Sequence, residues 1–121
     1  MIRASSDTVA CADPLVVQAV RFIREQAGRR LGVRDVLARV PASRRTLEVR
    51  FRRELGTTMH GEIVRARVDR AKRLLGETDM PVKAVAAACG FGTPQRFHAV
   101  FRREAGSAPA AWRRRARGPR R

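Results

Sequence analysis

Apolar residues recur every three or four positions in separate stretches of the chain, which is the spacing of one face of an α-helix. The first stretch contains Val16, Val20, Ile23 and Ala27. Asp13 and Pro14 precede it, and they supply an N-cap oxygen and a proline at the first helical position. Because Gly28 follows as a helix stop, the pattern predicts a helix from Asp13 to Gly28.

Six further stretches show the same spacing, and none alternates as a strand does. The further helices are expected at residues 33–40, 43–55, 59–77, 82–89, 93–105 and 108–115. Ser43 and Thr93 are predicted N-caps, and Gly56 and Gly106 are predicted helix stops. The prediction is therefore an all-α fold of about seven helices, in which the nonperiodic residues 1–12 form a flexible lead-in or truncated linker.

A five-letter phrase occurs twice, as "FRREL" at residues 51–55 and as "FRREA" at residues 101–105. At the same offset along the chain, Ser43 matches Thr93, Leu47 matches Phe97, Glu54 matches Glu104 and Gly56 matches Gly106. In the helix before each phrase Val36 matches Val85 at an offset one residue shorter, so the second turn is one residue longer. The sequence therefore contains an internal repeat of a short helix, a turn and a second helix.

Each copy of the repeat has the order of a helix-turn-helix unit, whose second helix enters the major groove of DNA. The expected organisation is a first helix-turn-helix subdomain at residues 13–58, a linker helix at 59–77, a second helix-turn-helix subdomain at 78–115 and a basic tail at 116–121. The same arrangement predicts double-stranded DNA as the partner.

The linker helix carries a continuous apolar stripe, and its arginines are expected on the far side. The stripe consists of Ile63, Val64, Val68, Ala71, Leu74 and Leu75. At 1.5 Å per residue the helix spans about 28 Å, which is close to the roughly 34 Å of one duplex turn. We therefore expect the two recognition helices to enter successive major grooves on one face of the duplex.

The chain is strongly basic, with 27 Lys and Arg residues against 11 Asp and Glu residues and a net charge of +16. All the basic residues except Lys72 and Lys83 are arginine. A polyanion is the partner that such a surface attracts. The final run "RRRARGPRR" is expected to be solvated and to add salt-dependent, sequence-independent affinity.

The positions at which the two copies differ are the candidates for reading bases, because identical residues are poorly suited to reading different bases. They are Arg45, Glu48 and Val49 in the first copy, and Gln95, Arg96 and Ala99 in the second. Arginine pairs with guanine, glutamate accepts from cytosine, glutamine reads adenine, and a small apolar side chain contacts the thymine methyl. Two alternatives stay open, namely a solvated helix face and an orienting role for Glu48 toward a neighbouring arginine.

The candidates for phosphate contacts are polar side chains on or beside the same two helices. They are Arg44, Arg50, Arg52, Arg53, Thr93, Arg102 and Arg103. The arginine pairs of the repeated phrase lie toward the helix C-termini, where they also complement the helix dipole. Because both copies carry these pairs, we expect them to supply affinity and the differing positions to supply specificity.

Side chains suited to catalysis or metal binding are few and scattered. Cys11 and Cys89 are too isolated for a disulfide framework, and His60 and His98 have no carboxylate or cysteine at metal-ligand spacing. We therefore expect no enzyme activity, no metal and no cofactor. No apolar run reaches the length of a membrane span, so we expect a cytoplasmic, nucleoid-associated protein with no membrane partner.

The stretch "RVDRAKRLLGETDMPVKAVAAACGFGTPQRFHAVFRREAGSAPAAWR" resembles the signature of the AraC/XylS family of bacterial transcription regulators. "SRRTLEVRFRRELGTTMHGEI" is similar to the first helix-turn-helix of that family, most closely to that of the xylose-operon regulators. The resemblance covers about residues 15–115 and implies the same six base-facing positions. Pro41 stands where a turn glycine is usual, so the first turn needs another geometry. Gly92 and Pro94 also depart from the family pattern and leave the first contacts of the second recognition helix open.

The resemblance also implies partners and a biological role. A transcription activator is implied, with RNA polymerase as a further partner and a sugar-catabolic operon as the target. A sugar effector is implied only through an amino-terminal domain that is missing from this sequence. The chain is accordingly expected to be an isolated domain or a truncated product, with a native small regulator as the alternative.

Two other classes of function use a basic helical surface. One is an RNA-binding or ribosome-associated structural protein, and the other is a helical protein that acts at anionic membranes. A recognition helix cannot enter the deep major groove of A-form RNA, so competition between duplex DNA and RNA separates the first class. The membrane class predicts helix formation only with lipid, whereas the apolar stripes predict a fold in buffer.

Overall fold

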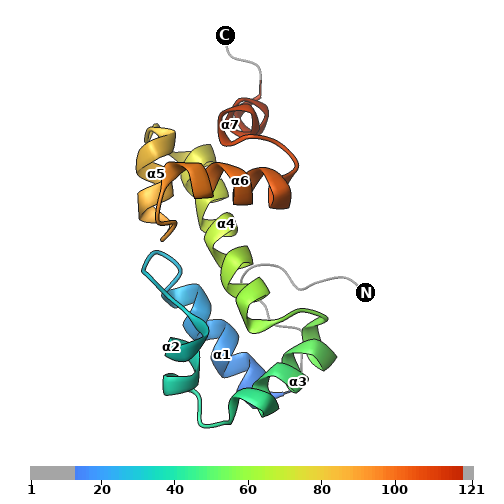
Figure 1. Cartoon of the computed structure of the whole chain (residues 1–121). Helices are drawn as coiled ribbons and strands as arrows, with labels where there is room; N and C mark the ends of the chain where they lie inside the picture. Colours follow the sequence, from blue (N-terminus) through green and yellow to red (C-terminus); the bar gives the residue numbers. More distant parts are fainter. Residues whose placement is uncertain (1–12, 119–121) are drawn as a thin grey trace. The chain divides into compact units, whose positions relative to one another are not determined.

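Seven helices make up the part of the chain that the computed structural model describes, residues 13–118 (Figure 1). They are α1 (Pro14–Glu25), α2 (Val33–Arg39), α3 (Arg44–Leu55), α4 (Met59–Glu77), α5 (Val82–Ala88), α6 (Pro94–Ala105) and α7 (Pro109–Arg117). No strand occurs within this range. The predicted all-α fold of about seven helices is therefore confirmed, while the predicted lead-in, residues 1–12, lies outside the described residues.

The helices divide into two compact units. The first unit contains the described residues up to Gln26 together with Leu31–Ala66, and the second contains Ala27–Arg30 and the chain from Arg67 onward. The single helix α4 contributes its first part to one unit and its remainder to the other. The loop residues Ala27–Arg30, which we expected in the first subdomain, pack with the second unit.

In the first unit, α1 packs against α2 and α3. The core is built from Val16, Ala19, Val20, Ile23, Val36, Leu47, Phe51, Met59 and Ile63, each at most 1% exposed. Asp13 caps α1 as predicted, because its side chain accepts from the backbone N–H of Leu15 at 3.0 Å and of Val16 at 3.4 Å. The predicted stop at Gly28 is wrong, since α1 ends at Glu25 and the backbone N–H of Gln26 closes it.

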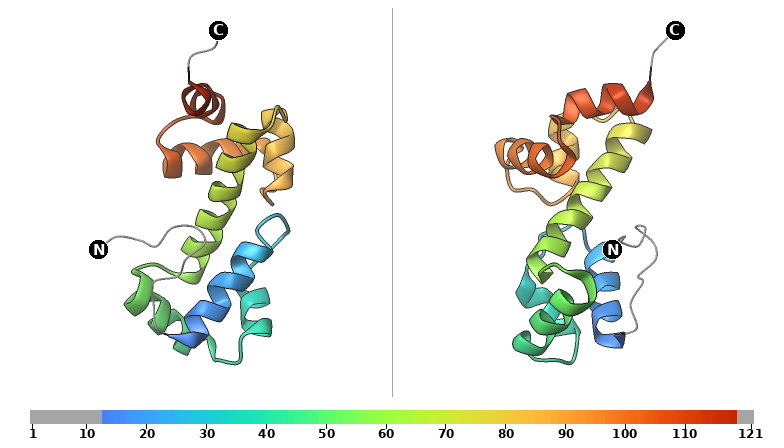
Figure 2. Two further views of the ribbon diagram at one scale, coloured as in Figure 1. Left: turned by 180° about the vertical axis from the view of Figure 1, so that it is seen from behind. Right: turned by 90° about the vertical axis from the view of Figure 1, so that its right-hand side faces the viewer.

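In the second unit, α6 packs against α5 and α7 (Figure 2). An aromatic row joins these helices: the ring centroids of Phe91 and Phe97 are 5.0 Å apart, those of Phe97 and Phe101 5.5 Å, and those of Phe101 and Trp112 6.1 Å. The last pair meets edge to face, a favoured geometry for aromatic rings. Trp112 therefore docks on the second half of the chain, as its position in the sequence predicted.

Helix α4 has the predicted bounds and buries Ile63, Val64, Val68, Ala71 and Leu75. The expectation that its arginines lie on the far side is wrong for Arg67, and the acidic residue Glu62 is buried as well. Glu62 is 2% exposed and Arg67 is 8% exposed. Helix α4 belongs in part to each unit, and side chains outside its apolar stripe are also buried.

The arginine run at the end of the chain is not a solvated tail throughout, because α7 extends to Arg117. The guanidinium of Arg113 donates to the backbone carbonyls of Leu75 at 2.9 Å, Thr78 at 3.2 Å and Met80 at 2.7 Å. Carbonyls at a helix C-terminus lack partners within the helix, and a cation there also complements the helix dipole. The expectation that the arginine run is solvated is therefore wrong for Arg113, whose side chain fastens α7 to the end of α4.

The two helix-turn-helix turns have different geometries. The first, residues 40–43, contains a hydrogen bond of 2.8 Å from the N–H of Ala42 to the carbonyl of Val40 and has no residue with positive φ. The second, residues 89–93, contains Gly90 at a φ of 81°. Around Gly90, the N–H of Phe91 donates to Ala86 and that of Gly90 donates to Ala87, which is a Schellman end. Both predictions about the turns, the extra residue and the changed geometry at Pro41, are confirmed.

Candidate nucleic-acid interface

The first recognition helix, α3, is fixed at its start by a cap and along one side by the core. The Oγ of Ser43 accepts from the N–H of Thr46 at 3.1 Å. Leu47 and Phe51 are fully buried, so the opposite side of the helix turns outward. That side carries the three predicted base-reading residues of the first copy, Arg45, Glu48 and Val49, all exposed.

Two details make this outward side suited to contact with a partner. Val49 is 53% exposed, so its apolar side chain is available for contact with a partner. The Nε of Arg44 donates to the Oε2 of Glu48 at 3.0 Å, one helical turn apart. The structure thus has Glu48 orienting a neighbouring arginine. Because both side chains are more than half exposed, the pair contributes only about 0.3–0.5 kcal/mol and can exchange for contacts with a partner.

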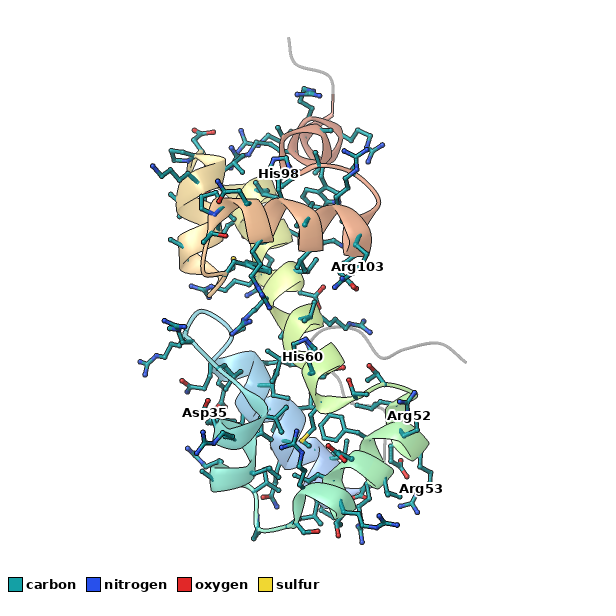
Figure 3. The ribbon with its side chains drawn as sticks, viewed as in Figure 1. Asp35, Arg52, Arg53, His60, His98 and Arg103 are labelled. Atoms are coloured by element: carbon teal, nitrogen blue, oxygen red, sulfur yellow. The ribbon has the colours of Figure 1, made fainter. Side chains whose placement is uncertain are left out.

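A hollow of about 540 Å³ lies beside α3 in the first unit. It is lined by Val33, Arg44, Glu48, Val49, Arg52, Thr58, Met59 and His60. Four of these residues belong to α3, so the outward side of the helix borders a concave surface formed with the start of α4. His60, for which the sequence predicts neither a catalytic nor a metal-binding role, is exposed at this border (Figure 3).

The second recognition helix, α6, is built in the same way. The Oγ1 of Thr93 accepts from the N–H of Arg96 at 3.1 Å, and Pro94 takes the first helical position. Phe97 and Phe101 are fully buried. The predicted base-reading residues Gln95, Arg96 and Ala99 are all exposed, as is His98. Each recognition helix therefore presents its differing positions to solvent and its repeated aromatic positions to the core.

The arginine pairs of the repeated phrase lie in the last turns of α3 and α6, and all four residues are exposed. Arg52 and Arg53 project from α3 and Arg103 projects from α6 (Figure 3). Two of them make ion pairs within their own unit: the Nε of Arg103 lies 3.3 Å from the Oε2 of Glu104, and that of Arg53 lies 3.6 Å from the Oε2 of Glu54. Exposed pairs of this kind are weak, so the guanidinium groups can still contact phosphates.

Arg50 differs from the other predicted phosphate contacts, because its guanidinium donates a hydrogen bond to a buried carboxylate. Its Nη1 donates to the Oδ2 of Asp13 at 3.0 Å, and the side chain of Asp13 is 5% exposed. Burial alone would raise the pKa of the Asp13 carboxyl, but the hydrogen bonds from Arg50, Leu15 and Val16 outweigh burial and lower that pKa. Sequence reasoning found the cap at Asp13 but had no local signal for a partner 37 residues away.

Sequence reasoning also missed Arg67, a buried arginine of α4 in the second unit. The pKa of its guanidinium is lowered, first by burial and then by the positive charges of Arg96 and Arg30. Arg96 is one of the predicted base-reading residues. The positive charge around the start of α6 is therefore larger than the residues of α6 alone supply.

The described residues offer little support for a catalytic nucleophile or a metal site. Cys89 is buried, and burial raises the pKa of its thiol to about 11, although Arg70 and Arg73 act in the opposite direction. Such a thiol stays protonated at neutral pH and is a poor nucleophile. Within residues 13–118, no group of three or more His, Cys, Asp or Glu side chains could hold a metal ion. None of the helices in this range is both long and apolar enough to cross a membrane.

Comparison with known proteins places the two units in a known family. The family described as "Helix-turn-helix domain" matches residues 36–115. The "Xylose operon regulatory protein" of Haemophilus influenzae is 39% identical over 111 residues, which are 92% of this chain and 29% of that protein. The protein of the same name from Escherichia coli K12 is 34% identical over 111 residues, which are 92% of this chain and 28% of that protein. The chain thus spans less than a third of the length of these relatives.

Solved structures show the same architecture. The structure described as "xylose-binding transcription activator xylR" superposes with a TM-score of 0.82 at 34% identity and covers 93% of this chain and 30% of that chain. The DNA-binding domain of AdpA, solved "in complex with a target DNA", superposes with a TM-score of 0.76 at 38% identity and covers 84% of this chain and 91% of that chain. All of these similar proteins are described as regulatory or transcription proteins, so the RNA-binding alternative gains no support.

Proposed function

The chain belongs to the AraC/XylS family of helix-turn-helix transcription regulators, and from this membership we propose that its two units read two major-groove segments of one DNA duplex. The observation that carries the proposal is the repeat itself. Each copy presents an exposed, capped recognition helix, and the two helices share the Phe-Arg-Arg-Glu phrase but differ at the outward residues before it. Two recognition helices with different outward residues are suited to a DNA site that has two different half-sites.

Base reading in this proposal comes from the six exposed positions at which the copies differ. Arg45 and Arg96 are the strongest candidates, because neither guanidinium has an ion-pair partner among residues 13–118 and each can pair with guanine. Glu48 is held by Arg44 and is released to accept from cytosine when the arginine contacts a phosphate. Val49, Gln95 and Ala99 complete the two faces.

Phosphate binding in this proposal comes mainly from the exposed arginines that both copies share, Arg52, Arg53, Arg102 and Arg103. Their contacts hold each helix in register and carry no sequence information. Thr93 is already used as the cap of α6, but its hydroxyl hydrogen remains available for a phosphate oxygen. Arg50 is proposed to keep the start of α1 on α3 and not to contact phosphate, because Asp13 binds its guanidinium.

The wider role is a proposal that rests on similar proteins. Two relatives are described as xylose operon regulatory proteins and one solved structure as a xylose-binding transcription activator. We propose that this chain directs activation of a sugar-catabolic operon, with RNA polymerase as a further partner and without catalysis of its own. A sugar effector would bind in a part of such a regulator that this chain does not match, since the match covers less than a third of those relatives.

Selection of bound sequences from a random duplex library tests the proposal. The expected product is a split motif with two unlike half-sites about one helical turn, or about 10 base pairs, apart. Arg45→Ala is expected to relax one base position in one half-site by about 1–3 kcal/mol, and Arg96→Ala one position in the other. The two variants serve as controls for each other.

Three outcomes would contradict this proposal. In the first, both variants lose the same affinity for every sequence, which would reduce the recognition helices to phosphate binders. In the second, an A-form RNA duplex competes as well as the selected DNA, although a helix cannot enter its major groove. In the third, the selected motif contains one half-site only.

A further inference from the structure

The loop between α1 and α2 contains four residues, Ala27–Arg30, that pack with the second unit. In the sequence they lie far from α5 and α6, and sequence reasoning gave them no role beyond ending a helix. In the structure they lie against the turn that precedes the second recognition helix. Their position therefore brings two arginines, Arg29 and Arg30, to the second helix-turn-helix.

Two glycines allow this close approach of one backbone segment to another. A Cβ atom at Gly90 would lie 2.7 Å from the carbonyl oxygen of Arg29, and one at Gly28 would lie 3.1 Å from that of Ala88. The Nε of Arg70 donates to the same Ala88 carbonyl at 3.1 Å and also contacts the position of a Gly28 Cβ. The backbone of the loop therefore lies directly against the turn at both glycines.

The side chains that this loop presents are basic and unengaged. Arg29 and Arg30 are both exposed, and neither has an ion-pair partner among the described residues. The Nε of Arg67 lies 3.2 Å from the position of a Cβ at Gly90, the same position that the Arg29 carbonyl approaches. Burial, and then the charges of Arg96 and Arg30, lower the pKa of the Arg67 guanidinium. Arg30 thus belongs to one group of positive charges, the Arg30–Arg67–Arg96 cluster, at the start of α6.

Positive charges gathered at one place on a surface attract an anion. The anion that fits is a phosphate of a nucleic-acid backbone, because Arg96 in the same cluster lies in the first turn of the recognition helix. Guanidinium groups are also well matched in geometry to phosphate oxygens. The charge and the place of the cluster thus favour the duplex that α6 binds over any other polyanion.

We propose that Arg30, with Arg29 beside it, binds backbone phosphates of the DNA duplex next to the segment that α6 reads. The inference rests on the proposed function and extends it, since the phosphate contacts of the second unit then come partly from a loop of the first half of the sequence. The loop acts as a positioning element, because phosphate contacts fix how deeply and in what register a recognition helix sits.

The test compares Arg30→Ala with Arg21→Ala, which removes the same charge from an exposed position on α1. Affinity is measured over a series of salt concentrations, for the duplex selected by the wild-type chain and for a random-sequence duplex of the same length. We expect Arg30→Ala to weaken both duplexes by the same factor, about five- to tenfold. We also expect the slope of log affinity against log salt to fall by about 0.9, while Arg21→Ala leaves the slope unchanged.

Two further variants complete the test. Arg30→Lys keeps the charge and is expected to recover most of the salt slope, and Arg30→Gln replaces Arg30→Ala if the latter melts at a lower temperature than the wild type. Equal slopes for the variants at positions 30 and 21 would overturn the inference and leave the proposed function intact. A change in the selected base sequence with Arg30→Ala would also overturn it. Failure of the wild type to select any sequence would count against the proposed function itself.

Discussion

The guanidinium of Arg113 binds three backbone carbonyls at and beyond the end of α4, at distances between 2.7 and 3.2 Å. A single side chain thereby satisfies acceptors that a helix C-terminus leaves without partners. Arg117 also donates to the carbonyl of Thr78, so the carbonyls of Leu75 and Met80 depend most on Arg113. The neighbouring Arg114 is exposed. Adjacent arginines of one run therefore have quite different roles.

This difference gives a prediction for stability. Arg113→Ala is expected to lower the free energy of unfolding by about 1–3 kcal/mol, because partly buried carbonyls lose a charged donor. Arg114→Ala removes the same charge and is expected to stay within about 0.5 kcal/mol of the wild type. Urea unfolding of the two variants measures both values. Equal loss in the two variants would mean that net charge matters here and that the hydrogen bonds do not.

At the scale of the helices, α1 and α3 are joined by one buried carboxylate. Asp13 caps α1 through the N–H groups of Leu15 and Val16 and also accepts from Arg50 of α3. The helix that begins the first unit is therefore bound to the helix proposed to read DNA. Because Arg53 lies 3.6 Å from the same carboxylate, the end of α3 shares this anchor.

The lowered pKa of Asp13 predicts how this anchor responds to pH. The carboxyl titrates below its ordinary value of 3.8 in the folded chain, so it stabilises the fold above that value and the contribution is lost as pH falls through the lowered pKa. Asp13→Asn keeps a good N-cap residue and removes the charge. We expect the variant to be less stable than the wild type at neutral pH, with the difference shrinking in acid. Urea unfolding across this pH range measures it, and a difference that does not change with pH would exclude the ion pair as its source.

At the scale of the whole molecule, the dominant quantity is the net charge of +16. A charge of this size predicts strong binding to any polyanion at low salt. The proposed contacts add a local component to this general attraction, because the shared arginines of α3 and α6 sit at the ends of the recognition helices. Salt dependence separates the two components, since each phosphate contact releases its own condensed counterions.

The prediction for the whole molecule compares two double variants of equal charge. Replacing Arg102 and Arg103 by glutamine is expected to reduce the slope of log affinity against log salt by about 1.8, or about 0.9 for each lost contact. Replacing the exposed Arg21 and Arg73, which lie on α1 and α4, is expected to leave the slope unchanged. Titration of the selected duplex at several salt concentrations gives both slopes. Equal slopes for the two double variants would show that only the net charge acts.

Much of this architecture could be predicted from short-range pattern. The helices, the caps at Asp13, Ser43 and Thr93, and the exposed faces of α3 and α6 depend on residues within a few positions of one another. The repeat of a short helix, turn and second helix could also be predicted, because two similar units need apolar core residues at the same spacing. These features follow from local hydrogen bonding and from the period of the helix.

Contacts between residues far apart in the chain could not be predicted in this way. Arg50 binds Asp13, Arg113 binds the end of α4, and Arg67 is buried, although charged residues are exposed in most proteins. The packing of Ala27–Arg30 with the second unit is also a contact between residues far apart in the chain. Sequence pattern indicates which face of a helix is apolar, but the partner of a charged side chain depends on where packing brings distant backbone, and only the folded chain decides that.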